Sequence, residues 1–251
     1  MKLKTIALSS TLLLGAAISS FSAHAADKVK FVTEGAWAPF NFIDNAGNPQ
    51  GFDVDIARAL CARMEADCEI HTQDWDGLIP ALQRKKYDAI IASMSVTEDR
   101  LKVVDFTDKY YSGGLRFMGR AGETFDLANL DGKVIGAQRA TLGAQYLEDN
   151  FEGKADLKFY DNQDNVYLDL VAGRLDIVLS DELPTYNWLK TSEDGDKFEF
   201  KGDAFLKTDN IAVAVRKGDE LKDKINKALA EILADGTYQK INAKYFPFSI
   251  Y

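Results

Sequence analysis

The sequence predicts an α/β fold built from two α/β units. Through the first hundred residues, apolar strand-like runs alternate with segments of helical periodicity. The alternation begins again after Gly113-Gly114, and polar residues follow several of the expected strands. Strands separated by helices form parallel sheets, which bind ligands where the carboxyl ends of their strands meet. Two facing units are therefore expected to share one ligand.

Residues 1–25 have the pattern of a secretory signal peptide that is cut after Ala25. Lys2 and Lys4 precede an apolar run from Ile6 to about Ile18, and Ala23-His-Ala25 follows it. This run is too short to span a bilayer, and no later segment approaches the roughly 20 apolar residues of a transmembrane helix. We expect a soluble, exported chain that begins near residue 27.

The first unit is expected to run strand, helix, strand, helix, strand. The strands are expected at Val29–Thr33, Glu69–Gln73 and Ala89–Ala92, and the helices at Phe52–Ala66 and Trp75–Arg84. An aromatic-rich loop, Gly35–Phe42, and a turn at Asp44–Asn48 are expected between the first strand and the first helix.

The second unit is expected to repeat this order. A short helix at Asp126–Gly132 comes first, followed by strands at Lys133–Gln138, Leu157–Tyr160 and Leu175–Ser180 and helices at Thr141–Asn150 and Asn162–Ala172. A strand at Ile211–Val215 and an amphipathic helix at Glu220–Ala234 follow.

The segment Tyr87–Arg100 has the features of a receptor for a small carboxylate. Ser93 and Ser95 follow a strand-like run at the spacing of one face. Thr97 is expected to cap a short helix whose acidic first turn contains Arg100, so hydroxyls, backbone N–H groups and a guanidinium converge. The alternative is an ordinary strand-to-helix junction with a solvated arginine.

Charge and cysteine usage exclude several other classes. The net charge of −9 becomes more negative once Lys2 and Lys4 are removed, which opposes nucleic-acid binding. Cys61 and Cys68 favour a disulfide between the end of one helix and the next strand in an oxidising compartment. Metal binding is the alternative, but only His71 remains after cleavage, too few soft ligands for structural zinc.

A set of ordered motifs resembles one known family over nearly the whole mature chain. The motifs are Glu34-Gly-Ala-Trp-Ala-Pro-Phe40, Gly51-Phe-Asp-Val-Asp55, Trp75-Asp-Gly-Leu-Ile-Pro80, Ser93-Met-Ser-Val-Thr-Glu-Asp-Arg100, Asp105-Phe-Thr-Asp108 and Asp235-Gly-Thr-Tyr238. Together they resemble the periplasmic amino-acid-binding proteins of ABC importers, solute-binding protein family 3, particularly those for lysine, arginine, ornithine and histidine.

The resemblance implies a two-lobed type II periplasmic-binding-protein fold with two hinge strands. Lobe one would comprise residues 27–112 and 209–251, and lobe two residues 113–208. The implied ligand is a basic L-amino acid, arginine before lysine, ornithine or histidine, and the implied partner is an inner-membrane permease of a Gram-negative bacterium. A monomer without cofactor or metal is expected in the periplasm.

The resemblance also implies roles for particular residues. It assigns Arg100 and Thr141 to the ligand α-carboxylate, and Asp181, with Ser93 and Ser95, to the α-ammonium. Glu34 matches the acid of basic-ligand relatives, and Trp37 and Trp75 match positions that sandwich the ligand side chain. Asp181 has the alternative reading of a helix N-cap before Glu182-Leu-Pro184, and the tryptophans that of core packing.

Two positions depart from the family pattern. Ala92 replaces a serine, so only its main chain could bind the ligand there. Arg139 replaces part of a glycine-containing turn and brings a second cation near the cleft, where Glu34 or Asp53 would offset it. We expect Arg139 to point outward or to pair across the lobes.

Other functions remain as alternatives. The same clamp could bind an opine or glutamine. An exported dehydratase of this fold could use Glu34, Asp181 and His71 as acid and base, although the sequence has no recognisable nucleophile–base pair. A receptor sensing module would need a transmembrane or signalling segment, which we do not find before Tyr251.

Overall fold

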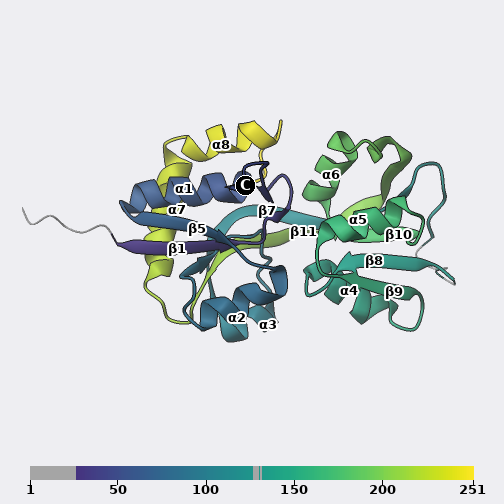
Figure 1. Cartoon of the computed structure of the whole chain (residues 1–251), viewed down its shortest axis with the longest axis horizontal. Coiled ribbons are helices and arrows are strands. Elements are labelled where there is room, and N and C mark those ends of the chain that lie inside the picture. Colours follow the sequence, from purple (N-terminus) through teal and green to yellow (C-terminus); the bar gives the residue numbers. More distant parts are fainter. Residues whose placement is uncertain (1–26, 127–129, 131) are drawn as a thin grey trace, which may run out of the picture.

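The computed structural model describes residues 27–126, 130 and 132–251. The expected signal peptide, and most of the short helix expected at 126–132, lie outside the described residues. The remaining chain forms two lobes that are joined by two long strands (Figure 1).

One mixed sheet of eight strands runs through both lobes, in the order β5-β1-β6-β11-β7-β10-β8-β9. Its strands are β1 (Lys28–Thr33), β5 (Asp67–Thr72), β6 (Ala89–Ile90), β7 (Asp105–Arg120), β8 (Val134–Gln138), β9 (Asp156–Tyr160), β10 (Ile177–Asp181) and β11 (Phe198–Val215). A small second sheet contains β2 (Ala36–Trp37), β3 (Asn41–Ile43) and β4 (Pro49–Gln50), where the sequence predicted a loop and a turn.

The long strands β7 and β11 connect the lobes. They pair antiparallel from Asp105↔Val215 to Arg120↔Phe198, with several register shifts between. The predicted parallel pairing is confirmed within each unit, where β1 pairs with β5 and β6, and β8 pairs with β9 and β10. The long strands β7 and β11 add antiparallel pairs at the centre, which strand and helix periodicity did not predict. The strand expected at 211–215 is only the end of β11. The lobe limits implied by the resemblance, at 112/113 and 208/209, fall inside β7 and β11.

The first lobe holds β1, β5 and β6 with helices on both faces (Figure 1). These helices are α1 (Phe52–Met64), α2 (Leu78–Gln83, after the 3-10 turn η1, Trp75–Gly77), α3 (Glu98–Val103), α7 (Leu221–Ala234) and α8 (Thr237–Tyr245). The larger core joins Phe31 of β1 and Ile56 of α1 to Ile225 of α7 and Tyr238 of α8. The last two helices therefore complete the core of the first lobe.

The second lobe holds β8, β9 and β10 with α4 (Leu142–Phe151), α5 (Gln163–Val171), α6 (Glu182–Thr191) and the 3-10 turn η2 (Gly195–Lys197). Successive residues of a strand face opposite sides of a sheet. Accordingly Ile177 and Leu179 pack in the core that contains α4, whereas Val178 packs in the core that contains α5. The helix α6 begins at Glu182, where the sequence offered a helix only as the alternative reading of Asp181 as an N-cap.

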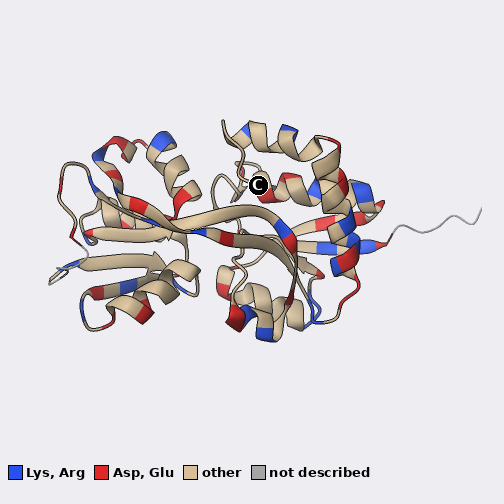
Figure 2. Cartoon of the chain, turned by 180° about the vertical axis from the view of Figure 1, so that it is seen from behind, with Lys and Arg blue, Asp and Glu red and all other residues tan. Residues whose placement is uncertain are grey.

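Charged residues of both signs are interspersed along both lobes (Figure 2). Among the helices of the described residues, none is long and apolar enough to cross a membrane.

Candidate functional site

A pocket lies between the two lobes, lined by residues of both. Every residue that the resemblance assigned to the ligand lines it, together with Gln138 and Leu142. The lining residues are Glu34, Trp37, Trp75, Ala92, Ser93, Ser95 and Arg100 from the first lobe, and Gln138, Thr141, Leu142 and Asp181 from the second. The fold thus collects these residues from segments far apart in the chain.

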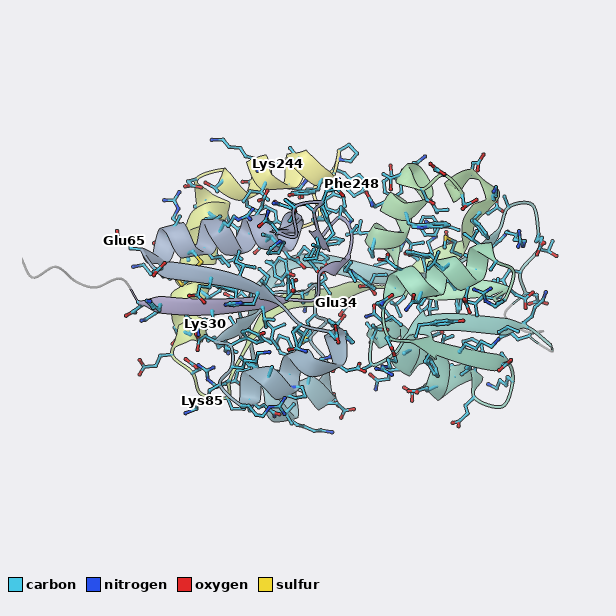
Figure 3. The ribbon with its side chains drawn as sticks, in the orientation of Figure 1. Lys30, Glu34, Glu65, Lys85, Lys244 and Phe248 are labelled. Atoms are coloured by element: carbon cyan, nitrogen blue, oxygen red, sulfur yellow. A yellow bond between two sulfur atoms is a disulfide. The ribbon has the colours of Figure 1, made fainter. Side chains whose placement is uncertain are left out.

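The ends of strands position most of the polar residues in the pocket. Glu34 follows β1, Ser93 follows β6, and Gln138 and Asp181 are the last residues of β8 and β10. Figure 3 shows Glu34 at the edge of the first lobe, facing the second. The pocket therefore lies where ligands bind in sheets of this type, outside the carboxyl ends of the strands.

Arg100 is held by its own segment and by the opposite lobe. Thr97 caps α3 as predicted, with its Oγ1 accepting from the Arg100 backbone N–H at 3.3 Å. The guanidinium donates to the Ser95 carbonyl at 2.7 Å and to the Ala140 carbonyl at 2.9 Å. Burial lowers the pKa of Arg100 to about 10, although Asp209 and Asp181 act against this shift. The side chain stays charged at neutral pH and keeps further N–H groups for a ligand anion.

The predicted strand geometry of Ser93 and Ser95 is wrong. Strand β6 ends at Ile90, and Ser93 has a φ of 53°, so regular strand alternation does not orient the two hydroxyls. Ser93 Oγ donates to Asp53 at 3.0 Å, and Ser95 Oγ donates to Asp209 at 2.6 Å. Because each hydroxyl proton points to a carboxylate, the oxygens can act only as acceptors toward a ligand. This arrangement suits an ammonium group.

Asp53 supports the pocket from behind. It is fully buried, does not line the pocket, and accepts from Tyr110 Oη and Asn41 Nδ2, each at 2.8 Å, as well as from Ser93. Burial raises the pKa of Asp53 to about 6 despite these bonds. Asn41 in turn accepts from the backbone N–H of Gly35 at 2.7 Å. Asp53 therefore positions Ser93 directly, and through Asn41 it positions Gly35, the residue after Glu34.

Two carboxyl groups lie near Arg100: Asp181, which lines the pocket, and Asp209, which does not. Asp181 occupies the N-cap position of α6 but makes no side-chain capping hydrogen bond, so capping does not occupy its carboxylate. Burial raises the pKa of Asp181 to about 8; nearby Asp209 raises it further, and Arg100 lowers it. A cation bound between these carboxylates would favour their charged forms.

Thr141 begins α4. Its Oγ1 accepts from the Ala144 N–H at 3.2 Å and donates to the Gln138 carbonyl at 2.7 Å. The hydroxyl proton is therefore used within the second lobe. What Thr141 brings to the pocket is the N-terminal end of α4, which attracts anions.

Glu34 and Trp37 line the pocket as well, and so does Trp75, whose ring centre lies 5.3 Å from the guanidinium carbon of Arg100. Burial raises the pKa of Glu34 to about 7, while a 2.7 Å hydrogen bond from Gln138 Nε2 lowers it. Trp37 and Trp75 are each less than a tenth exposed, and both belong to hydrophobic cores of the first lobe. Core packing and pocket lining, which the sequence presented as alternatives, therefore hold together for both tryptophans.

Arg139 lies beside the pocket and pairs across the lobes. It contacts Asp76 of the first lobe and Asp161 of the second, the latter at 2.8 Å. The Ala140 carbonyl next to it accepts from both Trp75 Nε1, at 3.2 Å, and Arg100. With the bond between Glu34 and Gln138, these contacts hold the lobes together around the pocket.

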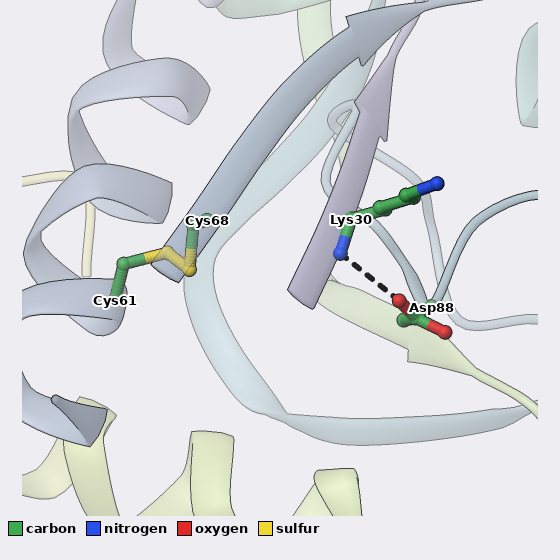
Figure 4. Close-up of a disulfide and its surroundings, with 4 residues drawn as sticks. All are labelled: Lys30, Cys61, Cys68 and Asp88. Carbon is green, nitrogen blue, oxygen red and sulfur yellow. Dashed lines mark hydrogen bonds between the residues drawn. A yellow bond between two sulfur atoms is a disulfide. The ribbon is translucent and has the colours of Figure 1, made fainter. Parts of the chain in front are cut away.

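The predicted disulfide is confirmed and lies away from the pocket. Cys61 of α1 bonds to Cys68 of β5 (Figure 4). No metal-binding cluster of His, Cys, Asp or Glu occurs within residues 27–126, 130 and 132–251.

Sequence reasoning did not assign Asp209, Gln138 or Leu142 to the site. Asp209 lies within a strand that the sequence did not predict. Gln138 and Leu142 flank Arg139 and Thr141, so their place at a strand end and a helix start was a usable signal.

Comparisons with known proteins show the family and the fold. The family of bacterial extracellular solute-binding proteins, family 3, matches residues 29–248. The lysine/arginine/ornithine-binding periplasmic protein of Escherichia coli (strain K12) is 38% identical over 259 residues, covering 100% of this chain and 99% of that one. A structure of an ancestral arginine-binding protein bound to arginine has a TM-score of 0.83 at 34% identity, covering 89% of this chain and 100% of that chain. A structure of an ancestral arginine-binding protein bound to glutamine has a TM-score of 0.82 at 35% identity, covering 90% and 100%.

Proposed function

Because the chain belongs to family 3 of the bacterial extracellular solute-binding proteins, we propose that it captures a basic L-amino acid, arginine first, between its lobes. It then delivers the ligand to an inner-membrane ABC permease. The observation that carries the choice of a basic ligand is the presence of two acids in one pocket, Glu34 from the first lobe and Asp181 from the second, with a single arginine, Arg100, among its described lining residues.

The ligand backbone binds at the Arg100 end. The guanidinium and the N-terminus of α4 take the α-carboxylate, because both present N–H donors. Asp181 takes the α-ammonium, with the oxygens of Ser93 and Ser95 as acceptors. The Ala92 main chain lies beside them in the lining. The positive charges of the ligand balance the negative charges of the buried carboxylates.

The ligand side chain lies toward Glu34. An aromatic face attracts a cation by about 0.5 to 2 kcal/mol, so Trp37 and Trp75 favour a guanidinium or ammonium between them and the acid. Arginine suits this end best, because a flat guanidinium stacks on an indole as well as pairing with a carboxylate.

Closure of residues 27–112 with 209–251 onto residues 113–208 traps the ligand. The strands β7 and β11 are the hinge, and ligand contacts from both sides favour the closed arrangement. We propose that the protein works in the periplasm of a Gram-negative bacterium as a monomer, after cleavage near Ala25.

Isothermal titration calorimetry against the twenty amino acids, ornithine and an opine tests this proposal. We expect arginine to bind most tightly, followed by the other basic amino acids. Binding of acidic or apolar amino acids without any basic one would overturn the assignment of Glu34.

Glutamine is the second candidate, because an ancestral arginine-binding protein of similar fold is also known with glutamine bound. Tighter binding of glutamine than of arginine in the same titrations would favour it. Turnover of a cyclohexadienyl acid by the purified protein would instead favour the dehydratase alternative.

A further inference from the structure

Gln138 is a buried polar residue with one amide atom that makes no hydrogen bond to the described residues. It is the last residue of β8, is 1% exposed, and lines the pocket beside Glu34 of the other lobe. Its Nε2 donates to Glu34 Oε1 at 2.7 Å and to the Asp161 carbonyl at 3.3 Å.

The hydrogen bonds fix which way the amide faces. The Asp161 main-chain carbonyl can only accept, so the amide atom that contacts it must be the nitrogen. The other atom is therefore Oε1, which is buried and has no hydrogen-bond partner among the described residues. Leaving a buried acceptor unpaired costs about 1 to 3 kcal/mol, so such an atom in a binding pocket points to a donor on the ligand.

We infer that Gln138 is a specificity-determining residue, which sets its Oε1 beside the Glu34 carboxylate as a second acceptor and thereby selects a guanidinium over an ammonium side chain. The inference rests on the proposed function and names the residue pair that makes arginine the preferred ligand. Glu34 comes from the first lobe and Gln138 from the second. The acceptor pair therefore exists only when the lobes meet.

The chemistry of the two cations explains the selection. A guanidinium presents N–H groups in a rigid planar fork, which fits two neighbouring acceptors at once. One Glu34 oxygen is engaged by Gln138 Nε2, so its other oxygen and Gln138 Oε1 remain for such a fork. An ammonium is a compact charge whose attraction depends mainly on the Glu34 carboxylate. Loss of the neutral acceptor therefore harms arginine more than lysine.

The test compares Gln138→Met with Gln163→Met, using calorimetry with arginine and with lysine. Gln163 is a matched control, since it is 2% exposed in the same lobe and has an unpaired amide nitrogen, but does not line the pocket. In Gln138→Met the dissociation constant for arginine should rise by about 10- to 100-fold, the loss expected for a hydrogen bond to a charged group. Lysine should weaken by less than about 3-fold, and Gln163→Met should leave the ratio of the two constants unchanged.

The ratio of the arginine and lysine dissociation constants distinguishes a role of Gln138 in ligand selection from a role in lobe closure. If Gln138 only helped to hold the lobes together, Gln138→Met would weaken both ligands equally, and that result overturns the inference. If the wild-type protein binds no basic amino acid, the proposed function fails first. Should Gln138→Met unfold in circular dichroism, Gln138→Glu decides instead. It keeps an acceptor at the position of Oε1, although it loses the Nε2 donor to Glu34, and should retain the wild-type preference for arginine. A preference for lysine would contradict the inference.

Discussion

The two ends of the pocket are assembled in different ways. The end proposed to bind the ligand backbone, the backbone-reading end, is mostly one continuous segment, in which Arg100 bonds to Ser95 and is placed by the cap at Thr97. The end proposed to bind the ligand side chain, the side-chain end, joins Glu34 to Gln138, 104 residues later. Under this proposal, recognition of what all amino acids share is largely built by local structure, whereas discrimination among them depends on tertiary contacts between the lobes.

The ends also differ in how fully their polar atoms are paired. Ser93, Ser95 and Thr141 all have hydrogen-bond partners within the protein. At the other end, Gln138 Oε1 and Trp37 Nε1 are buried without partners among residues 27–126, 130 and 132–251. The backbone-reading end is therefore preorganised, whereas the side-chain end is completed by what binds there.

Removing Arg100 should produce the largest effect, because it serves every ligand. Arg100→Ala should weaken arginine, lysine and glutamine alike by at least about 100-fold, since a charged partner of the carboxylate is lost from a buried site. Calorimetry with each ligand measures this. Arg58→Ala, which removes an exposed arginine from α1, is the control. Loss of affinity for only one ligand would contradict the proposed division of roles between the two ends of the pocket.

Neutralising Glu34 should change selection rather than general affinity. Glu34→Gln keeps the size of the side chain and removes its charge, so arginine and lysine should weaken by about 30-fold or more. Glutamine should change by less than about 3-fold. The same titrations serve as the measurement, and an equal loss for all three ligands would show that Glu34 reads the backbone as well.

The raised pKa values of Glu34 and Asp181, to about 7 and about 8, predict a pH effect at both ends. Between pH 5 and 8 the folded, ligand-free chain retains protons that the unfolded chain has released, so its stability falls as the pH rises. Bound arginine favours the ionised carboxylates and offsets this loss. Saturating arginine should therefore raise the melting temperature more at pH 8 than at pH 5, in thermal unfolding followed by circular dichroism. Glu34→Gln should make the two increases in melting temperature more similar. Equal increases at pH 5 and pH 8 in the wild-type protein would contradict the prediction.

The smallest effect is expected at Arg139, which pairs across the lobes outside the pocket. Its ion pairs are exposed, and such pairs contribute about 0.2 to 1 kcal/mol, so Arg139→Ala should weaken every ligand by about 1.5- to 5-fold without changing their order. Arg174→Ala is the matched control, because Arg174 pairs with Asp169 inside one lobe. A change in ligand order after Arg139→Ala would place this residue in the side-chain end.

The backbone-reading end was the more predictable one. Caps such as Thr97 and Thr141 involve residues three apart, so a short stretch of sequence contains the whole interaction. The hydroxyl directions of Ser93 and Ser95 were not predictable in this way, because Asp53 and Asp209 come from distant segments.

The hinge strands were accessible only through the family resemblance. Residues 105–120 contain Gly113-Gly114, which the sequence presents as a boundary, and the β7–β11 register shifts several times. Neither strand shows the regular alternation from which strands are predicted. Gln138 was predicted to end a strand, but its significance depends on its hydrogen bond to Glu34, which only the fold brings near.

The discontinuous core of the first lobe also has a consequence for the order of folding. Ile225 and Tyr238, near the end of the chain, bury Phe31 and Ile56, near its beginning. A chain emerging from the ribosome therefore exposes this apolar surface until almost its last residue has been made. The stretch from β8 to β10 is continuous and depends mainly on near neighbours, which favours early pairing. The first lobe is therefore expected to reach its stable fold only after α7 and α8 have been made, later than the second lobe.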